Sequence, residues 1–196
     1  GICGVSAGIG IFKGILASTP NIRLGDVVAS GQATVVYDCE GNEIDQYVST
    51  NSNRLRVESM DELPDYLGKA FVAIEDERFY KHHGVDIKRT LGATGKWVLS
   101  KVGIGSSNYG GSTITQQVIK NITNEKENTP SRKVKEMMRA VALEKQLTKD
   151  EILTMYLNIV YFANNCNGVE AAANTYFNKD ASDLTLAEAA SIAGIT

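Results

Sequence analysis

A carboxylate pair, Glu75 and Asp76, follows an apolar run in the segment AFVAIEDERFYKHHG, and it is the first place where the chain could do chemistry. If the run is helical, it forms one buried stripe at spacings i, i+4 and i+7, made of Leu67, Phe71 and Ile74. Glu75 then lies at the edge of the core, where partial desolvation makes a carboxylate a better proton acceptor near neutral pH. This pattern predicts a general base, although a solvated glutamate beside a core stripe produces the same pattern.

A second candidate is the polar face of a helix expected over residues 112–123. Polar side chains recur there one turn apart or beside one another, at Ser112, Thr113, Gln116, Gln117, Lys120 and Asn121. The opposite face is apolar, with Ile114, Val118 and Ile122. Solvated helix faces carry mostly charged residues, whereas this face carries hydroxyls and amides with a single lysine. Its composition favours a ligand-binding surface.

The next expected helix, over residues 130–147, carries a cluster of charges. Arg132, Glu136 and Arg139 recur at i, i+4 and i+7, with Lys133 and Lys135 beside them. One interpretation is a set of surface ion pairs that contribute little to stability. The other is an anion site in which Lys120, Arg132 and Lys135 converge while Glu136 holds them in place. The spacing alone leaves both open.

Composition excludes several other classes of function. The net charge of −3 does not favour nucleic-acid binding. The three cysteines are far apart and the two histidines are adjacent, so neither a zinc site nor a disulfide framework is expected. The loop GSSNYGGS has glycine where a nucleotide-binding P-loop needs lysine. With 196 residues and 43% hydrophobic content, the chain can form one sizeable core.

The organisation of the chain follows from local patterns. Residues 1–18 are apolar and glycine-rich, and we expect the C-terminal part of a signal-anchor helix there, with an apolar leader docked on the domain as the alternative. Residues 19–58 are expected to be a linker with a β-hairpin, whose strands ATVVYD and EIDQYVS flank the turn CEGN. Residues 59–196 are expected to be a helical domain that is incomplete at its C-terminal end.

Within that domain, capping residues and apolar spacings mark the helices. Capping boxes are expected at Ser59/Glu62, Thr148/Glu151 and Thr185/Glu188, and an N-cap at Thr129 before Pro130. Two further stripes are predicted to be buried: Ile87, Leu91, Thr94, Val98 and Val102 in one helix, and Val134, Met138 and Val141 in another. The glycine-rich stretch 103–111 is expected to be a loop that could cover a groove.

Five segments, taken in order, resemble the signatures of one family. They are EDERFYKHHG, GGSTITQQVIKN, RKVKE, KDEILTMYLNIVYF and LTLAEAASIAGI, and they cover about residues 60–196. The chain resembles the peptidoglycan glycosyltransferases of glycosyltransferase family 51, which occur in class A, bifunctional penicillin-binding proteins. The resemblance implies a mainly α, lysozyme-like bilobal domain, with the short N-terminal β-hairpin and the remnant of a transmembrane anchor in front of it.

The resemblance also implies a reaction and its residues. Such enzymes polymerise lipid II into glycan strands with inversion at the donor anomeric carbon and release undecaprenyl pyrophosphate. Glu75 would be the base, and the leaving pyrophosphate would be neutralised by Lys120, Arg132 and Lys135. Glu136 would orient these cations or help to hold a divalent metal, Mg²⁺ or Mn²⁺. The matched motifs assign the remaining substrate contacts to Ser112, Gln116, Gln117, Arg78, Phe79 and Asn121.

The same resemblance implies a location and partners. The enzyme would be a single-pass protein of the cell membrane with its catalytic domain on the extracytoplasmic face. Its partners would be lipid II, the nascent glycan strand, the membrane, and proteins of cell-wall synthesis and division. Two other classes of protein remain as alternatives: a lysozyme-like hydrolase or lytic transglycosylase, which also uses one glutamate, and a non-catalytic helical scaffold that binds the lipid or a division protein.

Overall fold

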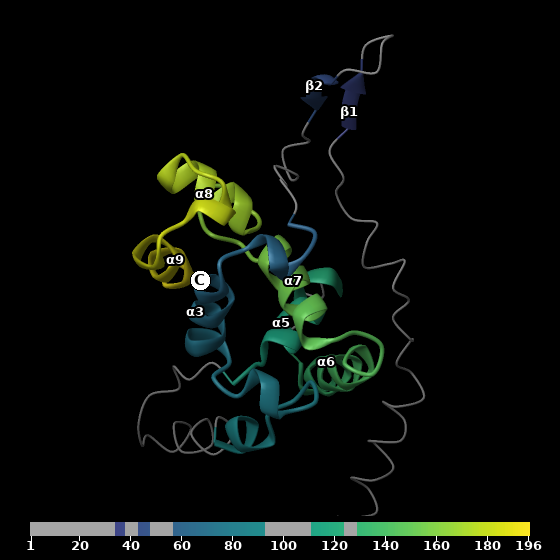
Figure 1. The fold of residues 1–196 in the computed structure, drawn as a ribbon. Helices are drawn as coiled ribbons and strands as arrows, with labels where there is room; N and C mark the ends of the chain where they lie inside the picture. Colours follow the sequence, from purple (N-terminus) through teal and green to yellow (C-terminus); the bar gives the residue numbers. More distant parts are fainter. Residues whose placement is uncertain (1–33, 38–42, 48–56, 93–110, 124–128) are drawn as a thin grey trace, which may run out of the picture.

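The computed structural model describes residues 34–37, 43–47, 57–92, 111–123 and 129–196 (Figure 1). This part of the chain is mainly α-helical, as expected from the sequence. Several predictions fall outside the described residues: the anchor at 1–18, most of the linker, the predicted helix beyond residue 92, and the loop at 103–110. They stay predictions.

Two short strands precede the helices. β1 (Thr34–Tyr37) and β2 (Glu43–Tyr47) pair antiparallel, with Thr34 opposite Tyr47, and the register shifts between Val36 and Tyr37. Both strands lie within the segments predicted to be extended. The turn expected between them falls outside the described residues.

The helical elements follow in chain order, with one short helical stretch at 87–92 between η2 and α5. The α-helices are α3 (Asp65–Glu75), α5 (Ile114–Thr123), α6 (Pro130–Leu143), α7 (Lys149–Ile159), α8 (Val169–Phe177) and α9 (Leu186–Ala193). Three single 3₁₀ turns separate some of them: η1 (Met60–Glu62), η2 (Phe79–Lys81) and η3 (Ala181–Asp183).

Most of the predicted helix starts are confirmed. Thr148 and Thr185 each form a reciprocal capping box with the glutamate three residues later, and the Thr129 hydroxyl accepts the Arg132 N–H at 3.2 Å. The expected box at Ser59 is different. Ser59 caps only the 3₁₀ turn η1, because the chain becomes extended at Leu63 and α3 begins after Pro64.

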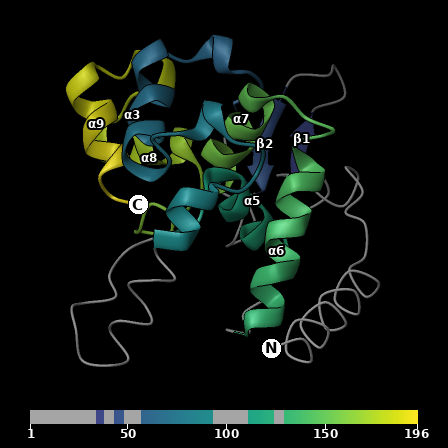
Figure 2. The same cartoon turned by 90° about the horizontal axis from the view of Figure 1, so that it is seen from below.

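The core forms where the helices meet around aromatic side chains. The Phe71 ring contacts the rings of Tyr156 and Phe162 edge-on, with centroids 6.1 and 5.7 Å apart. α3 packs against α9, while α5 packs against both α6 and α7 (Figure 2). The Asn158 side chain, on α7, bonds both the N–H and the C=O of Val57 at 2.9 and 2.7 Å. These contacts hold the helical core together, and the candidate site lies at its edge, at the end of α3 and the start of α5.

The buried face of α3 differs from the predicted stripe. Leu67 and Phe71 are buried, but Ile74 is 51% exposed, and Gly68 and Val72 complete the buried face. The reason is the missing side chain at Gly68, where a Cβ would lie 3.1 Å from a methyl group of Leu153. α3 therefore turns Gly68 toward Leu153 of α7, although an apolar pattern does not count glycine.

The other two predicted stripes are also wrong in part. On α6, Val134 and Met138 are only half-buried and Val141 is exposed, while the buried face consists of Glu136, Arg139, Ala140 and Leu143. A polar network replaces the expected apolar seam at the start of this helix. In the stretch 87–92, both Ile87 and Leu91 are exposed. On α5, Ile114 and Val118 are buried as expected and Ile122 is half-buried.

Candidate active site

The first turn of α5 is held by three separate contacts. The Thr113 hydroxyl accepts the Gln116 N–H at 3.1 Å and the Gln116 side-chain oxygen accepts the Thr113 N–H at 3.0 Å, which is a capping box. Oδ2 of the buried Asp76 accepts the Ile114 N–H at 3.0 Å and lies 2.9 Å from His82 Nε2. A carboxylate at this position satisfies an orphan amide and the positive end of the helix dipole. The segment EDERFYKHH is thus fastened to the start of α5.

Glu75 ends α3 and is half-buried. Its Oε2 accepts the Gln117 side-chain N–H at 2.7 Å, and its Oε1 accepts the Thr196 hydroxyl at 3.1 Å. Burial raises the pKa of the neighbouring Tyr156 phenol, and the negative charge of Glu75 raises it further. Both recorded donors to Glu75 are neutral, so its carboxylate can accept a proton without breaking an ion pair among the described residues.

Glu136 on α6 has the opposite surroundings. It is buried, and its carboxylate accepts from Arg132 at 2.8 Å, from the Lys133 ammonium, and from the Gln116 amide at 3.4 Å. The Lys133 ammonium also donates to the Ser112 hydroxyl at 2.7 Å. Two cations therefore share one carboxylate, and this group carries a net positive charge.

Two adjacent glutamines connect the two carboxylates. Gln117 reaches Glu75 and Gln116 reaches Glu136, and both extend from the first turns of α5. Because the two amides are consecutive in the chain, the start of α5 lies between a proton acceptor and a cationic group. This arrangement can deprotonate one group of a ligand while neutralising negative charge on another.

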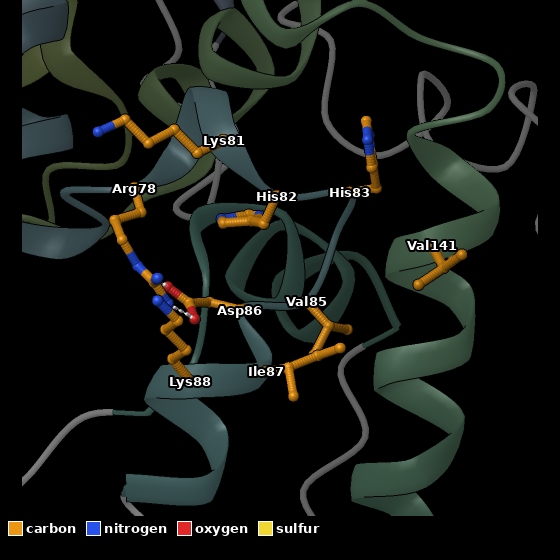
Figure 3. Close-up of a pocket in the computed structure, with 9 residues that line it drawn as sticks. All are labelled: Arg78, Lys81, His82, His83, Val85, Asp86, Ile87, Lys88 and Val141. Atoms are coloured by element: carbon orange, nitrogen blue, oxygen red, sulfur yellow. Dashed lines mark hydrogen bonds and ion pairs between the residues drawn. The ribbon is translucent and has the colours of Figure 1, made fainter.

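A second set of contacts braces the backbone of Glu75. Arg78 donates to both carboxylate oxygens of Asp86 (Figure 3), Asp86 accepts the Arg89 N–H at 2.9 Å, and the Arg89 guanidinium donates to the Glu75 carbonyl. Burial by itself raises the pKa of Asp86, but the hydrogen bonds from Arg89 and Arg78 and the Arg78 charge outweigh it, and the pKa lies below its usual value. Arg78, predicted to bind substrate, is held in this pair.

The structure brings together only part of the predicted site. Phe79 is fully buried, with the Lys149 ammonium 4.3 Å from its ring centroid, so its ring packs in the core, and its role as a substrate contact stays a prediction. Gln116 is also fully buried and serves the helix start and Glu136 rather than an open surface. Lys120 and Asn121 are exposed near the end of α5, and Lys135 is half-buried. Within the described residues, no recorded hydrogen bond or ion pair fixes these last three side chains.

A divalent metal at Glu136 does not fit this geometry. The carboxylate oxygens already accept from two cations and an amide, so a metal ion would have to displace them. Among the residues that the structure describes, no group of three histidine, cysteine, aspartate or glutamate side chains could hold a metal ion.

Sequence reasoning missed three residues of this region. Asp76 was noted only as the neighbour of Glu75, yet its carboxylate caps α5. Lys133 rather than Lys135 contacts Glu136. Gly84 has φ +87°, and a Cβ there would lie 2.7 Å from the backbone of Ala140, so only glycine fits. The spacing Thr113-x-x-Gln116 was a usable signal for the helix start, because it is the capping-box pattern.

Comparison with known proteins identifies the family of this domain. A family model described as Transglycosylase matches residues 40–196, which include Glu75, the start of α5 and Glu136. The chain belongs to the transglycosylase family. All the contacts described above between helices α3, α5 and α6 therefore lie within the transglycosylase match.

Relatives of this transglycosylase chain are similar over nearly its whole length. It is 43% identical over 194 residues to penicillin-binding protein 1A of Clostridium botulinum (strain Langeland), covering 99% of this chain and 23% of the relative. It is 44% identical to penicillin-binding protein 1A of Clostridium perfringens (strain 13), covering 96% and 28%. Penicillin-binding protein 1F of Bacillus subtilis (strain 168) is 41% identical over 82% of this chain and 21% of the relative. The chain thus spans about a quarter of the length of these relatives.

In the described part of the transglycosylase chain, no helix is long and apolar enough to span a membrane. The anchor predicted at residues 1–18 falls outside this part of the chain.

Proposed function

We propose that this chain is the glycosyltransferase domain of an enzyme that polymerises lipid II into peptidoglycan glycan strands. The observation that carries the proposal is the pair of adjacent amides, Gln116 and Gln117. Gln116 contacts Glu136, which is bound by two cations, and Gln117 contacts Glu75, which is held by neutral donors. Membership of the transglycosylase family supports the same reaction class. The domain would be lysozyme-like and bilobal, with a membrane-facing smaller lobe.

The proton-transfer role is given to Glu75. It would take the proton from the 4-hydroxyl of the acceptor sugar as that oxygen attacks the donor anomeric carbon. Attack from the face opposite the leaving group inverts the configuration, as when a base activates water in inverting glycosidases. Neutral hydrogen-bond donors at 2.7 and 3.1 Å support this role. They orient the carboxylate and, because they carry no positive charge, they do not oppose its taking a proton.

The leaving-group role is given to the cations near Glu136. The departing undecaprenyl pyrophosphate gains negative charge, which cations stabilise. Arg132 and Lys133 bring two positive charges and Glu136 removes one, so a net positive charge remains. Lys120 and Lys135 would add to it from the exposed side of α5 and from α6. Glu136 would act as a positioning residue that sets the direction of the two cations.

The proposal includes where the enzyme works. A signal-anchor helix at residues 1–18 would hold the catalytic domain on the extracytoplasmic face of the cell membrane, where lipid II and the nascent strand meet. Proteins of cell-wall synthesis and division would be its protein partners. Like the substrate, this placement follows from the family resemblance rather than from a contact in the fold.

The test is polymerisation of labelled lipid II by the purified protein in detergent, comparing Glu75→Gln with Glu77→Gln. Loss of a general base lowers turnover by about 10²- to 10⁴-fold. We expect that loss in Glu75→Gln with lipid II binding retained. Glu77 is exposed and two residues away, so the same substitution there controls for a change of charge in this segment.

The other outcomes separate the rival functions. Equal polymer from the parent protein and Glu75→Gln would contradict the assignment of the base. Soluble fragments released from preformed glycan would indicate the hydrolase or lytic class instead. Binding of lipid II with no product from any variant would indicate a scaffold.

A further inference from the structure

The peptide group that joins Glu75 to Asp76 connects two parts of the candidate site. On one side of it is the carboxylate that is proposed as the base, and on the other is the carboxylate that accepts the Ile114 N–H at the start of α5. α3 ends at this point, because Asp76 has φ −155° and ψ 68°, outside the helical range. The orientation of this one peptide group therefore affects where both carboxylates lie.

The carbonyl of this peptide group is bound by a cation. Carbonyls in the last turn of an α-helix have no partner within the helix, so they accept hydrogen bonds from outside it. The Glu75 carbonyl accepts one from the guanidinium of Arg89, which brings positive charge to the negative end of the α3 dipole. Hydrogen bonds from a charged donor are stronger than neutral ones. Arg89 is also half-buried, so it restricts the orientation of the peptide group.

Asp86 in turn determines where Arg89 lies. It is only 2% exposed, and one of its carboxylate oxygens accepts the Arg89 backbone N–H at 2.9 Å, which is the N-cap contact of the stretch 87–92. The Arg78 guanidinium donates to both oxygens of the same carboxylate, as Figure 3 shows. A helix cap and a bidentate ion pair thus hold the carboxylate in one orientation.

We infer that Arg89 is a positioning residue for the base Glu75, and that Asp86 holds Arg89 in place. The inference rests on the proposed glycosyl transfer, in which Glu75 takes the proton of the acceptor hydroxyl. The recorded bond from Arg89 goes to the Glu75 backbone, so Arg89 acts on the base through the peptide group. A displacement of about 1 Å caused far from the chemistry can lower a rate about 10²-fold, so a contact at the backbone of the base is close enough to matter.

The experiment compares kcat and KM for polymerisation of labelled lipid II in detergent by the purified parent protein and by Arg89→Met. Methionine keeps much of the apolar part of the arginine side chain but removes the donor and the charge. The matched control is Lys88→Met, because Lys88 is an exposed cation that is adjacent in the same helical stretch. Arg89→Lys is the conservative variant, since lysine still offers a charged donor.

We expect Arg89→Met to lower kcat about 10- to 100-fold and to change KM less than about twofold, because a misplaced base weakens the transition state rather than substrate binding. Lys88→Met should leave both constants unchanged, and Arg89→Lys should recover most of kcat. Circular dichroism at the assay temperature would show that each variant is folded. If Arg89→Met does not fold, Asp86→Asn replaces it in the comparison. Its expected loss of kcat is smaller, since asparagine still accepts the Arg89 N–H.

Combining Arg89→Met with Glu75→Gln separates positioning of the base from a general loosening of the fold. If Arg89 acts through the base, the double variant should be as slow as Glu75→Gln alone, because no base is left to position. A purely structural role would instead lower the residual rate of Glu75→Gln by the same factor as the rate of the parent protein. That result would overturn the inference.

The remaining outcomes distinguish this inference from the proposed function. An unchanged kcat in Arg89→Met, together with a large loss in Glu75→Gln, would overturn the positioning role and leave the base assignment intact. A rate in Glu75→Gln equal to that of the parent protein would contradict the base itself, and the positioning role with it. An equal loss in Lys88→Met would attribute the effect to the charge of the stretch rather than to the bond with the Glu75 carbonyl, and it would also overturn the inference.

Discussion

Glu75 and Glu136 are the same residue type in two different environments. Glu75 is half-buried and held by an amide and a hydroxyl, whereas Glu136 is 3% exposed and held by two cations. Protonation of Glu75 disturbs two neutral hydrogen bonds, but protonation of Glu136 would leave Arg132 and Lys133 without their counter-charge. These surroundings support the proposal that Glu75 transfers the proton and Glu136 organises charge.

The strongest test of this difference is the stability of Glu136→Gln. Removing one partner of a buried ion pair leaves the other uncompensated and costs about 3–5 kcal/mol. Because the Lys133 side chain is 36% exposed, we expect the lower end, about 3 kcal/mol, in the free energy of unfolding measured with urea.

Glu75→Gln is the matched variant for this measurement, since it changes the other carboxylate in the same way. Its free energy of unfolding should change by less than about 1 kcal/mol, because the donors recorded for Glu75 among the described residues are both neutral. If both substitutions destabilised the protein equally, the distinction between the two environments would fail.

The adjacent glutamines provide a second, smaller test. Gln117→Leu removes a donor from Glu75, and we expect kcat for glycan polymerisation to fall about tenfold, because a loosely held base is misplaced, with the melting temperature little changed. Gln116→Leu breaks the capping box of α5 and leaves the Thr113 N–H unpaired, so it should cost about 1 kcal/mol of stability.

Both glutamine variants are to be measured for both quantities, kcat and the free energy of unfolding. If each variant changes mainly one of these quantities, the two glutamines have separate roles. If Gln116→Leu lowers kcat as much as Gln117→Leu while leaving stability intact, that separation is contradicted.

The fold could be predicted from the sequence where a local signal decides it. The capping boxes at Thr148 and Thr185 need only residues three apart, and they are where expected. The buried faces of α3 and α6 could not be predicted in this way. Gly68 is buried because a neighbouring helix approaches it, and Glu136 is buried because Arg132 and Lys133 of the same helix neutralise it. Neither cause is visible in apolar spacing.

The site was predictable to the level of segments rather than of individual side chains. The motifs bring Glu75, Gln117 and Glu136 into one region, as the order of the segments implies. Helical spacing favours Lys133, which is three residues from Glu136, over the adjacent Lys135, but the assignment of Lys135 by its motif did not use this signal. Phe79 was chosen with its motif, although its large apolar ring is used in the core.

A third carboxylate, Glu188, separates the effect of an ion pair from that of burial and gives the smallest expected change. Its pKa is lowered to about 2, first by the hydrogen bond from Lys179 and then by the backbone and hydroxyl of Thr185. Because the folded pKa lies below the ordinary value of 4.5, Glu188 stabilises the fold above about pH 4.5, and this contribution is lost as the pH falls toward 2.

Glu188→Gln keeps a cap at the same position but removes the charge. We therefore expect its melting temperature to fall less steeply than that of the parent protein over this range, with Glu77→Gln as the control. Parallel curves for the parent and Glu188→Gln would show that the ion pair contributes nothing here, and the contrast between Glu75 and Glu136 would then depend on burial alone.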